Sequence, residues 1–199
     1  MKKTYLFIDG TNLYAGQYEL FGPKAYLNFS QLIKETEKKL NITFVKIYFY
    51  ASYSPKSEKP DKKEILYLKN EALFYKNVKR TKNVIFFTGY RSKTSGKEKE
   101  VDVKLATDLV AYAFLKKYDE VFLMTGDADF LQALLTVKSY HLKIIINLIC
   151  LENKIMFQGL FRFKTYFVIL NKKPILKRQF NTLTELDFTK EVKKFISLT

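Results

Sequence analysis

Four aspartates stand where apolar segments of this chain give way to polar turns or where a helix is expected to begin. Asp9 ends the first apolar run in YLFIDGTNLY, Asp102 lies in EVDVKLATDL, and Asp127 and Asp129 follow a later run in VFLMTGDADF. Carboxylates at the ends of separate parallel strands meet at one edge of a sheet, where α/β proteins bind their ligands. Hard cations such as Mg²⁺ prefer oxygen ligands. The four acids therefore predict a divalent-metal site.

Each acid also has a purely structural interpretation. Asp9 precedes Gly10, and an aspartate in such a pair often closes a turn or caps a helix. Asp102 is expected on the apolar face of the helix that follows, where an unpaired carboxylate is costly, although a helix beginning at Asp102 would make it a cap. Asp127 and Asp129 could cap the next helix. Capping explains any one acid, but the same arrangement at three places favours the metal site.

Asp108 follows Asp102 by six residues, about 120° further around an ideal helix. This rotation places Asp108 beside the apolar stripe of the helix rather than under it. We therefore expect Asp108 to support the site instead of holding a metal directly.

The hydrophobic pattern predicts strands that alternate with helices along most of the chain. Strands are expected at 4–8, 43–51, 84–88, 120–125, 142–151 and 164–170, and helices at 28–40, 64–76, 103–117 and 129–137. Such alternation indicates right-handed crossovers and a mainly parallel sheet with helices on both faces, an α/β three-layer sandwich. We expect one domain over 1–170. Residues 171–199 are expected to form a short appendage, with a helix near 189–196.

Composition excludes several other classes of protein. One cysteine, Cys150, rules out an internal disulfide and is expected to be a buried thiol; with one histidine, His141, it is too little for a usual zinc site. No nucleophile motif accompanies His141. The apolar runs are too short to span a bilayer, and Asp9 interrupts the first of them, so we expect a cytoplasmic protein and no membrane partner.

The net charge is +15, from 35 Lys and Arg against 20 Asp and Glu. Such a surplus favours a polyanionic partner, because each phosphate that is neutralised releases counterions. A compositional bias toward lysine is the alternative explanation. An acidic pocket inside a basic surface is what a nuclease requires, so the two features support each other.

Two other α/β enzyme classes fit the sequence less well. The DGT of residues 9–11 resembles phosphatases of the haloacid dehalogenase type, which carry a nucleophilic aspartate two residues earlier. Phe7 occupies that position here and cannot form an aspartyl-phosphate. A dinucleotide-binding fold would need a G-x-G-x-x-G after the first strand, which this chain lacks.

Three segments together resemble the NYN domain, a group of PIN-like nucleases that includes LabA-type bacterial proteins. These segments are FIDGTNLY at 7–14, EVDVKLATDL at 100–109 and TGDADF at 125–130, and the resemblance covers roughly residues 4–150. It implies a Rossmann-like PIN fold and a Mg²⁺- or Mn²⁺-dependent ribonuclease. The residues that it assigns to the metal and to catalysis are Asp9, Asp102, Asp127 and Asp129, with Asn12, Asp108 and Thr125 in support.

The chain departs from the family pattern at two turns. Glu100 stands where the family usually has glycine before the VDV segment, and Ser139, Tyr140 and His141 replace a small glycine-bearing turn. No acid is lost, so the departures concern the surface that would meet the substrate.

RNA is the expected partner, and two charged loops at 52–63 and 91–100 are candidates to hold its backbone, with Tyr53 and Tyr90 placed to stack on bases. The basic residues assigned to this role are Lys59, Lys62, Lys63, Arg91, Lys93 and Lys97. A non-catalytic RNA-binding or regulatory protein that keeps the acidic pocket is the main alternative, and a phosphatase-like hydrolase is the weaker one. The sequence is compatible with a homodimer.

Overall fold

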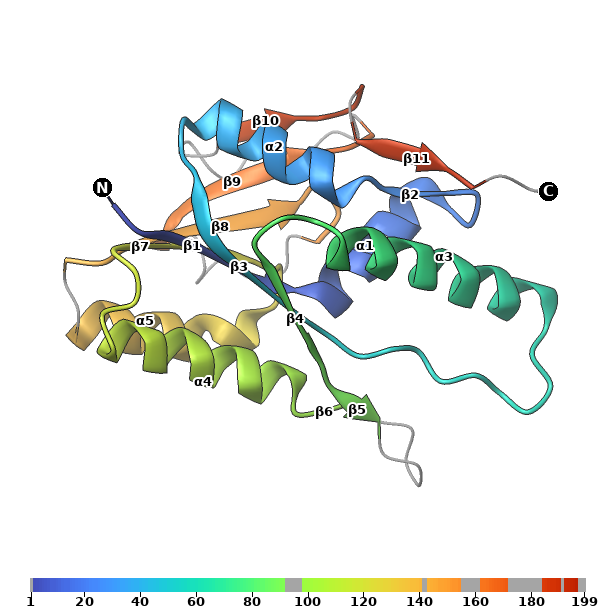
Figure 1. Ribbon diagram of the computed structural model, residues 1–199, viewed down its shortest axis with the longest axis horizontal. Coiled ribbons are helices and arrows are strands. Elements are labelled where there is room, and N and C mark those ends of the chain that lie inside the picture. The colour runs from blue at the N-terminus through green and yellow to red at the C-terminus, as the bar shows by residue number, and fades with distance from the viewer. Residues whose placement is uncertain are drawn as a thin grey trace.

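A seven-stranded sheet in the order β10-β9-β8-β7-β1-β3-β4 forms the centre of the protein in a computed structural model (Figure 1). The structure describes residues 2–91, 98–140, 143–154, 162–171, 184–190 and 192–196. Each neighbouring pair of strands in the described part of this sheet is parallel. Its strands are β1 (Thr4–Asp9), β3 (Phe44–Ala51), β4 (Val84–Thr88), β7 (Glu120–Met124), β8 (Ile145–Leu151), β9 (Lys164–Ile169) and β10 (Thr184–Asp187).

Helices cover both faces of the sheet, as Figure 1 shows. One face packs against α1 (Gly10–Phe21), α2 (Phe29–Leu40) and α3 (Lys62–Lys79), and the other against α4 (Val101–Phe114) and α5 (Leu131–Tyr140). A short 3-10 helix, η1 (Ala128–Phe130), precedes α5. The prediction of a Rossmann-like α/β sandwich is confirmed.

The two faces have separate apolar cores because side chains alternate along each strand. Leu6 and Ile8 of β1 belong to the core under α1, α2 and α3, whereas Tyr5 and Phe7 belong to the core under α4 and α5. The same alternation directs Asp9, the next residue, toward α4 and α5. The acid that ends β1 thus belongs to the α4 and α5 side of the sheet.

The chain order changes direction at β1. From β1 the chain leads to β3 and β4 on one side, and α4 then carries it to β7 on the other side. The carboxyl ends of β1 and β7 therefore lie next to each other at a topological switch point, the place where open parallel sheets bind ligands.

The helix α1 was not among the predicted helices, although capping of a helix was one of the two structural interpretations of Asp9. Asp9 is the residue before this helix, and its side chain accepts a hydrogen bond from the backbone N–H of Asn12. Gly10, Thr11 and Asn12 are poor helix formers. The cap and the burial of Leu13 and Leu20 in the core offset that weakness.

The predicted helix at 189–196 is wrong. Residues Lys193–Phe195 form β11, which pairs antiparallel with β2 (Ala25–Leu27). Val192 is buried in the core while Phe195 is exposed, and the backbone of Asn28 donates to the carbonyl of Val192. A free strand edge at β2 thus decides the conformation, which local propensity cannot anticipate. The domain boundary at 170 stays a prediction.

The two charged loops are shorter than expected. The helix α3 begins at Lys62, so Lys62 and Lys63 lie on its first turn, where Asp61 caps it by accepting from the N–H of Glu64. The second loop is flanked by β5 (Tyr90–Arg91) and β6 (Glu98–Lys99), which pair with each other. No helix in the described part of the chain is long and apolar enough to cross a membrane.

Candidate functional site

Asp9 lies at the centre of the carboxyl edge, and both of its carboxylate oxygens accept hydrogen bonds. Oδ1 accepts from the backbone N–H of Asn12 at 3.0 Å, and Oδ2 accepts from the hydroxyl of Thr125 at 2.9 Å. The side chain is almost enclosed, with 4% of its residue surface exposed. Asp9 can therefore both cap α1 and belong to a metal site, because Oδ1 caps the helix while Oδ2 is turned toward the end of β7.

Burial raises the pKa of Asp9 to about 7, and the negative charges of Asp102 and Asp127 add to this rise. The hydrogen bonds from Asn12 and Thr125 act in the opposite direction because they stabilise the ionised form. A desolvated carboxylate with two further acids in its electrostatic field is the arrangement that a bound cation stabilises.

The turn after β7 is tied to the turn after β1. The hydroxyl of Thr125 accepts from the N–H of Asp127 at 3.0 Å, and the N–H of Gly126 donates to the side-chain carbonyl of Asn12 at 3.3 Å. Beneath them, the thiol of Cys150 donates to the carbonyl of Thr125 at 2.9 Å. Thr125 and Asn12 thus connect the two turns that carry Asp9 and Asp127.

Asp127 and Asp129 occupy the start of η1. Asp127 is half-buried and caps η1 by accepting from the N–H of Asp129 at 3.0 Å. Asp129 is exposed in the first turn of η1. The structure therefore places Asp127 in the field of Asp9 and Asp129 further out toward solvent.

The expectation that Asp102 lies on the buried stripe of its helix is wrong, because its side chain is exposed. The helix α4 begins at Val101, so Asp102 is in the first turn, where no preceding turn of helix covers it. Side chains of a helix lean toward its N-terminus, which here faces the carboxyl edge of the sheet. Asp102 still acts on the pKa of Asp9, so it remains a member of the acidic group.

Asp108 is the buried acid of α4, with 7% of its surface exposed. The sequence had placed it beside the apolar stripe of the helix rather than under it. Its Oδ2 accepts from the hydroxyl of Tyr50 at 2.8 Å, and its Oδ1 forms an ion pair with Lys104, one turn earlier. These two partners satisfy a charge that would otherwise be costly to bury. The supporting role predicted for Asp108 thus has a physical basis.

Sequence reasoning missed Tyr50 and Lys104. Asp9 pairs with Tyr50 across β1 and β3, and Tyr50 pairs with Phe87 across β3 and β4, so the three side chains share one row and one face. Lys104 lies above this row, with Nζ 6.0 Å from the centre of the Phe87 ring. Its half-exposed ammonium therefore stands at the carboxyl edge. The i, i+4 spacing of Lys104 and Asp108 was the only signal in the sequence.

The donor set fits a hard divalent cation, because it consists of carboxylate oxygens around one desolvated aspartate. Among the described residues, no three acidic, histidine or cysteine side chains are close enough together to enclose a metal ion. Binding of a cation at Asp9 therefore requires the more exposed acids to turn toward it.

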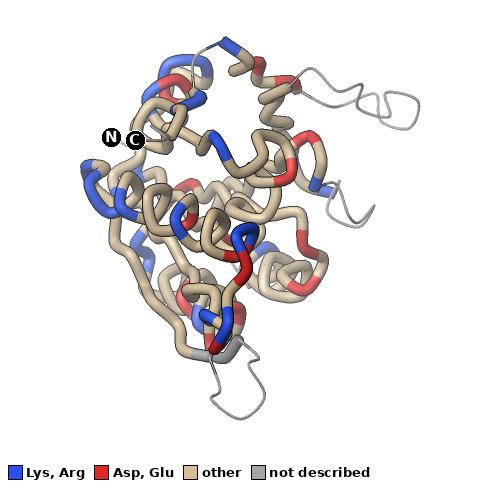
Figure 2. Tube along the Cα trace, turned by 90° about the vertical axis from the view of Figure 1, so that its right-hand side faces the viewer, with Lys and Arg blue, Asp and Glu red and all other residues tan. Residues whose placement is uncertain are grey.

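The basic residues assigned to RNA are only partly described. Lys59, Lys62 and Lys63 are exposed; only the backbone of Arg91 is described, and Lys93 and Lys97 lie outside the described residues, as does His141. Figure 2 shows basic segments on several elements rather than in one continuous stripe. The net charge therefore favours a polyanionic partner, but the described basic residues do not form one continuous binding surface.

Phe7 is fully buried and stacks on Tyr48, with ring centroids 5.1 Å apart. The position of a phosphatase nucleophile is thus filled by a core residue. Cys150 is a buried free thiol, as expected, and its burial raises its pKa to about 12, so it is not a nucleophile at neutral pH.

A parallel sheet with an acidic carboxyl edge is consistent with the PIN-like nuclease superfamily. The NYN domain model matches residues 3–171, most of the chain, and the protein belongs to the NYN family. The match does not distinguish LabA-type members from others. Comparison with curated proteins gives no match.

The fold is also that of a crystal structure of a protein of unknown function from Vibrio parahaemolyticus. The two are 14% identical in sequence and superpose with a TM-score of 0.55 over 96% of each chain. At this level of identity the similarity concerns the fold alone.

Proposed function

We propose that this protein is a metal-dependent ribonuclease that hydrolyses phosphodiester bonds at the carboxyl edge of β1 and β7. The observation that supports this most is the enclosed carboxylate of Asp9. Its pKa is raised to about 7 by burial and by the charges of Asp102 and Asp127. A buried acid surrounded by acids reduces stability unless a cation joins them. Function is the simplest reason to retain it.

Asp9, Asp102, Asp127 and Asp129 would hold Mg²⁺ or Mn²⁺. The ion, when bound, polarises a phosphoryl oxygen and lowers the pKa of the attacking water. Asp9 would ligate through a lone pair that its hydrogen bonds from Asn12 and Thr125 leave free. Asp129, the most exposed of the four, would ligate directly or orient a water molecule.

Lys104 would neutralise a phosphate next to the bond that is cut. Its ammonium is held by Asp108, which Tyr50 holds in turn, so the position of the charge is fixed before substrate arrives. Neighbouring strands among β1, β3 and β4 are about 5 Å apart. Lys104, which lies over β4, is therefore roughly 10 Å from β1, the strand of Asp9. A neighbouring phosphate of the same RNA strand lies within that range.

The remainder of the RNA would cross the carboxyl edge near the first charged loop. Tyr53 and Tyr90 are exposed there, and Lys59, Lys62 and Lys63 are exposed close by in sequence. Aromatic rings stack on unpaired bases while lysines attract the backbone, which is how proteins bind single strands.

The main alternative is a non-catalytic RNA-binding protein that keeps the acidic edge. The presence of all four acids and of their supporting hydrogen bonds favours the enzyme. A phosphatase activity has no support from the structure, since Phe7 is a core residue. We further propose that the protein is a LabA-type bacterial protein of the cytoplasm. Residues 1–170 would form the nuclease domain and residues 171–199 an appendage. A homodimer is one assembly to test.

The decisive experiment compares wild-type protein with Asp127→Asn on single-stranded RNA, single-stranded DNA and a small phosphate monoester, in Mn²⁺, Mg²⁺ or EDTA. Asparagine is as good a helix cap as aspartate, so the N–H of Asp129 keeps its acceptor and the fold should be unchanged. An equal Tm for the two proteins is the control.

Metal-dependent cleavage of RNA that falls about 100-fold or more in Asp127→Asn would establish the ribonuclease, since loss of one group that stabilises the charge of the transition state typically costs that much. Binding of RNA by both proteins without cleavage in any metal would establish the non-catalytic alternative. Release of phosphate from the monoester alone would establish the phosphatase.

A further inference from the structure

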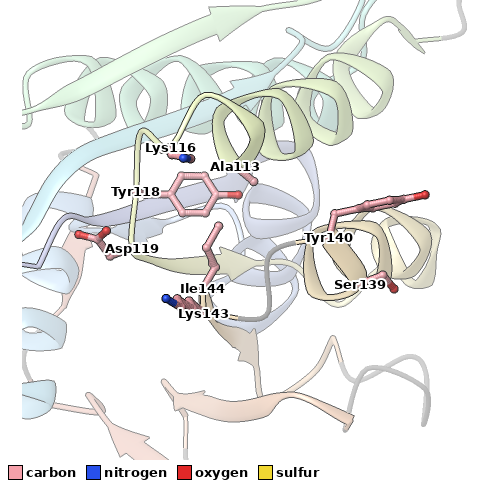
Figure 3. Close-up of a pocket in the computed structure, with 8 residues that line it drawn as sticks. All are labelled: Ala113, Lys116, Tyr118, Asp119, Ser139, Tyr140, Lys143 and Ile144. Carbon is pink, nitrogen blue, oxygen red and sulfur yellow. The ribbon is translucent and has the colours of Figure 1, made fainter.

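A hollow of about 570 Å³ lies at the opposite edge of the sheet from the acids, where α4 and α5 end. Its lining includes Tyr118 and Asp119 just before β7, and Lys143 and Ile144 just before β8. In Figure 3 the ring of Tyr118 lies at the middle of the group, with Lys116 on one side and Ile144 and Lys143 on the other. None of these residues takes part in the proposed active site.

Large apolar side chains are exposed together beside this hollow. Phe114 is 51% exposed, Leu115 62% and Tyr140 71%, and the rings of Phe114 and Tyr140 are in contact with centroids 5.8 Å apart. Single exposed apolar residues are common on protein surfaces, but a contiguous group beside a hollow is typical of a binding site.

Cations surround the same group. Lys116 and Lys143 line the hollow, Lys117 follows in sequence, and no ion pair involves any of the three within the described residues. The acid in the lining, Asp119, already accepts a hydrogen bond at 2.8 Å from the backbone N–H of Lys3. The cationic side chains are therefore available to a ligand.

Lys116 has a backbone conformation that disfavours any residue with a side chain. Its φ is 51°, in the left-handed region, and the turn is held by hydrogen bonds from Lys116 N to Ala113 O and from Lys117 N to Tyr112 O, both 2.9 Å. Glycine would adopt this turn without the cost of about 1 kcal/mol that a side chain brings. The turn has the left-handed geometry that is common at the C-termini of helices, and it ends α4 beside the hollow.

We propose that this hollow is a second binding site for single-stranded RNA, distinct from the active site, that holds a distal part of the substrate. Exposed rings that stack on bases, next to unpaired lysines that attract phosphates, are the features of single-strand sites. A second protein chain is the less suitable occupant, because the cores of protein interfaces are depleted in lysine. The inference rests on the proposed function, since it assigns a further part of the same RNA.

The distance between the two sites sets a length requirement. The helix α4 has 14 residues and runs from Val101, next to Asp102 of the active site, to Phe114 beside the hollow. At 1.5 Å per residue it is about 21 Å long. A stacked strand advances about 3.4 Å per nucleotide, so roughly six nucleotides are needed to reach both sites.

The test compares RNA of four and of 20 nucleotides as substrates for the wild type, for Tyr140→Ala and for the double variant Lys116→Gln, Lys143→Gln. The matched control is Lys34→Gln, an exposed lysine of α2 on the other face of the sheet. Exposed positions are chosen so that folding is preserved, and Tm is measured for each variant.

The site predicts a length-dependent loss. For the 20-nucleotide RNA, kcat/KM should fall about tenfold in Tyr140→Ala, the loss of one base stack. The double lysine variant should lower the slope of log affinity against log salt by about 1.4, because each phosphate contact with a single strand contributes about 0.7. The four-nucleotide substrate should be cleaved equally by all the proteins.

Equal cleavage of the long RNA by the wild type and both variants would overturn the inference, and so would an equal loss on both lengths. If the wild type cleaves no RNA, the proposed activity fails, but anisotropy with the labelled 20-nucleotide RNA in EDTA still decides this site. Weaker binding by the variants would support it, whereas unchanged binding, or none by the wild type, would overturn it. A dimer that Tyr140→Ala dissociates would show an interface between copies instead.

Discussion

The hydroxyl of Thr125, just past the end of β7, donates to the carboxylate of Asp9 at the end of β1, at 2.9 Å. The same hydroxyl accepts from the N–H of Asp127. One side chain thus aligns two acids that are more than 100 residues apart in the sequence. Because the chain reverses its order between β1 and β7, this hydrogen bond forms at the switch point itself.

Replacing Thr125 with valine should lower both stability and activity. Valine has a similar shape but no hydroxyl, so Asp9 loses a donor and the N–H of Asp127 loses its acceptor in a buried site. Such losses cost about 1–3 kcal/mol. Urea denaturation measures the cost, and Thr125→Ser, which keeps the hydroxyl, is the control. Equal stability of the valine and serine variants would show that the hydrogen bonds contribute nothing.

Asp9→Asn should stabilise the metal-free protein at pH 8 while abolishing its activity. The folded-state pKa of Asp9 is about 7, above that of the unfolded chain. The folded protein therefore binds a proton more tightly, and this contribution to stability is complete below pH 4 and is lost as pH rises through 7.

At pH 8 the wild type retains a desolvated charge that asparagine removes, so the variant should be more stable by about 4 kcal/mol, and the difference should disappear near pH 4. Thermal unfolding in EDTA at both pH values measures this. A variant less stable than the wild type at pH 8 would contradict the rise in pKa.

Lys104→Met should weaken RNA binding, whereas Lys104→Arg should preserve most of it. The loss of one phosphate contact should lower the slope of log affinity against log salt by the contribution of one phosphate. The decrease should be the same for every RNA sequence. Anisotropy in EDTA over a range of salt concentrations measures this. A merely structural ion pair with Asp108 would instead lower Tm and leave the salt slope unchanged.

Glu100→Gly should stabilise the protein by about 1 kcal/mol, since Glu100 has a φ of 72° and a side chain in that region is strained. This is the position where the family usually has glycine. The control is Glu100→Ala, which removes the charge but keeps Cβ, and it should give no comparable gain. Equal midpoints of urea denaturation for the glycine and alanine variants would contradict the strain.

The sequence predicted the strands and the helices that carry the acids because their apolar periods are long and regular. Asp9 and Asp127 could be assigned to one edge from strand ends alone. Asp102 could not be placed correctly, because the angle around a helix does not reveal that the helix starts at Val101, two residues before the predicted start at 103.

Contacts between distant segments were beyond reach of the sequence. The strand β11 depends on the free edge of β2, which lies more than 160 residues earlier. The group of Tyr50, Asp108 and Lys104 depends on the register of β3 against α4. The left-handed Glu100 could be suspected only because the family usually has glycine there.

Titration of Mn²⁺ by calorimetry into the wild type and into Asp9→Asn, at pH 7 in two buffers of different protonation enthalpy, tests the metal site most directly. Since the pKa of Asp9 is about 7, the wild type should bind Mn²⁺ and release about half a proton. Asp9→Asn should bind at least tenfold more weakly and release none from this position. Equal affinity and equal proton release in the two proteins, or no binding by the wild type, would contradict a cation held by Asp9.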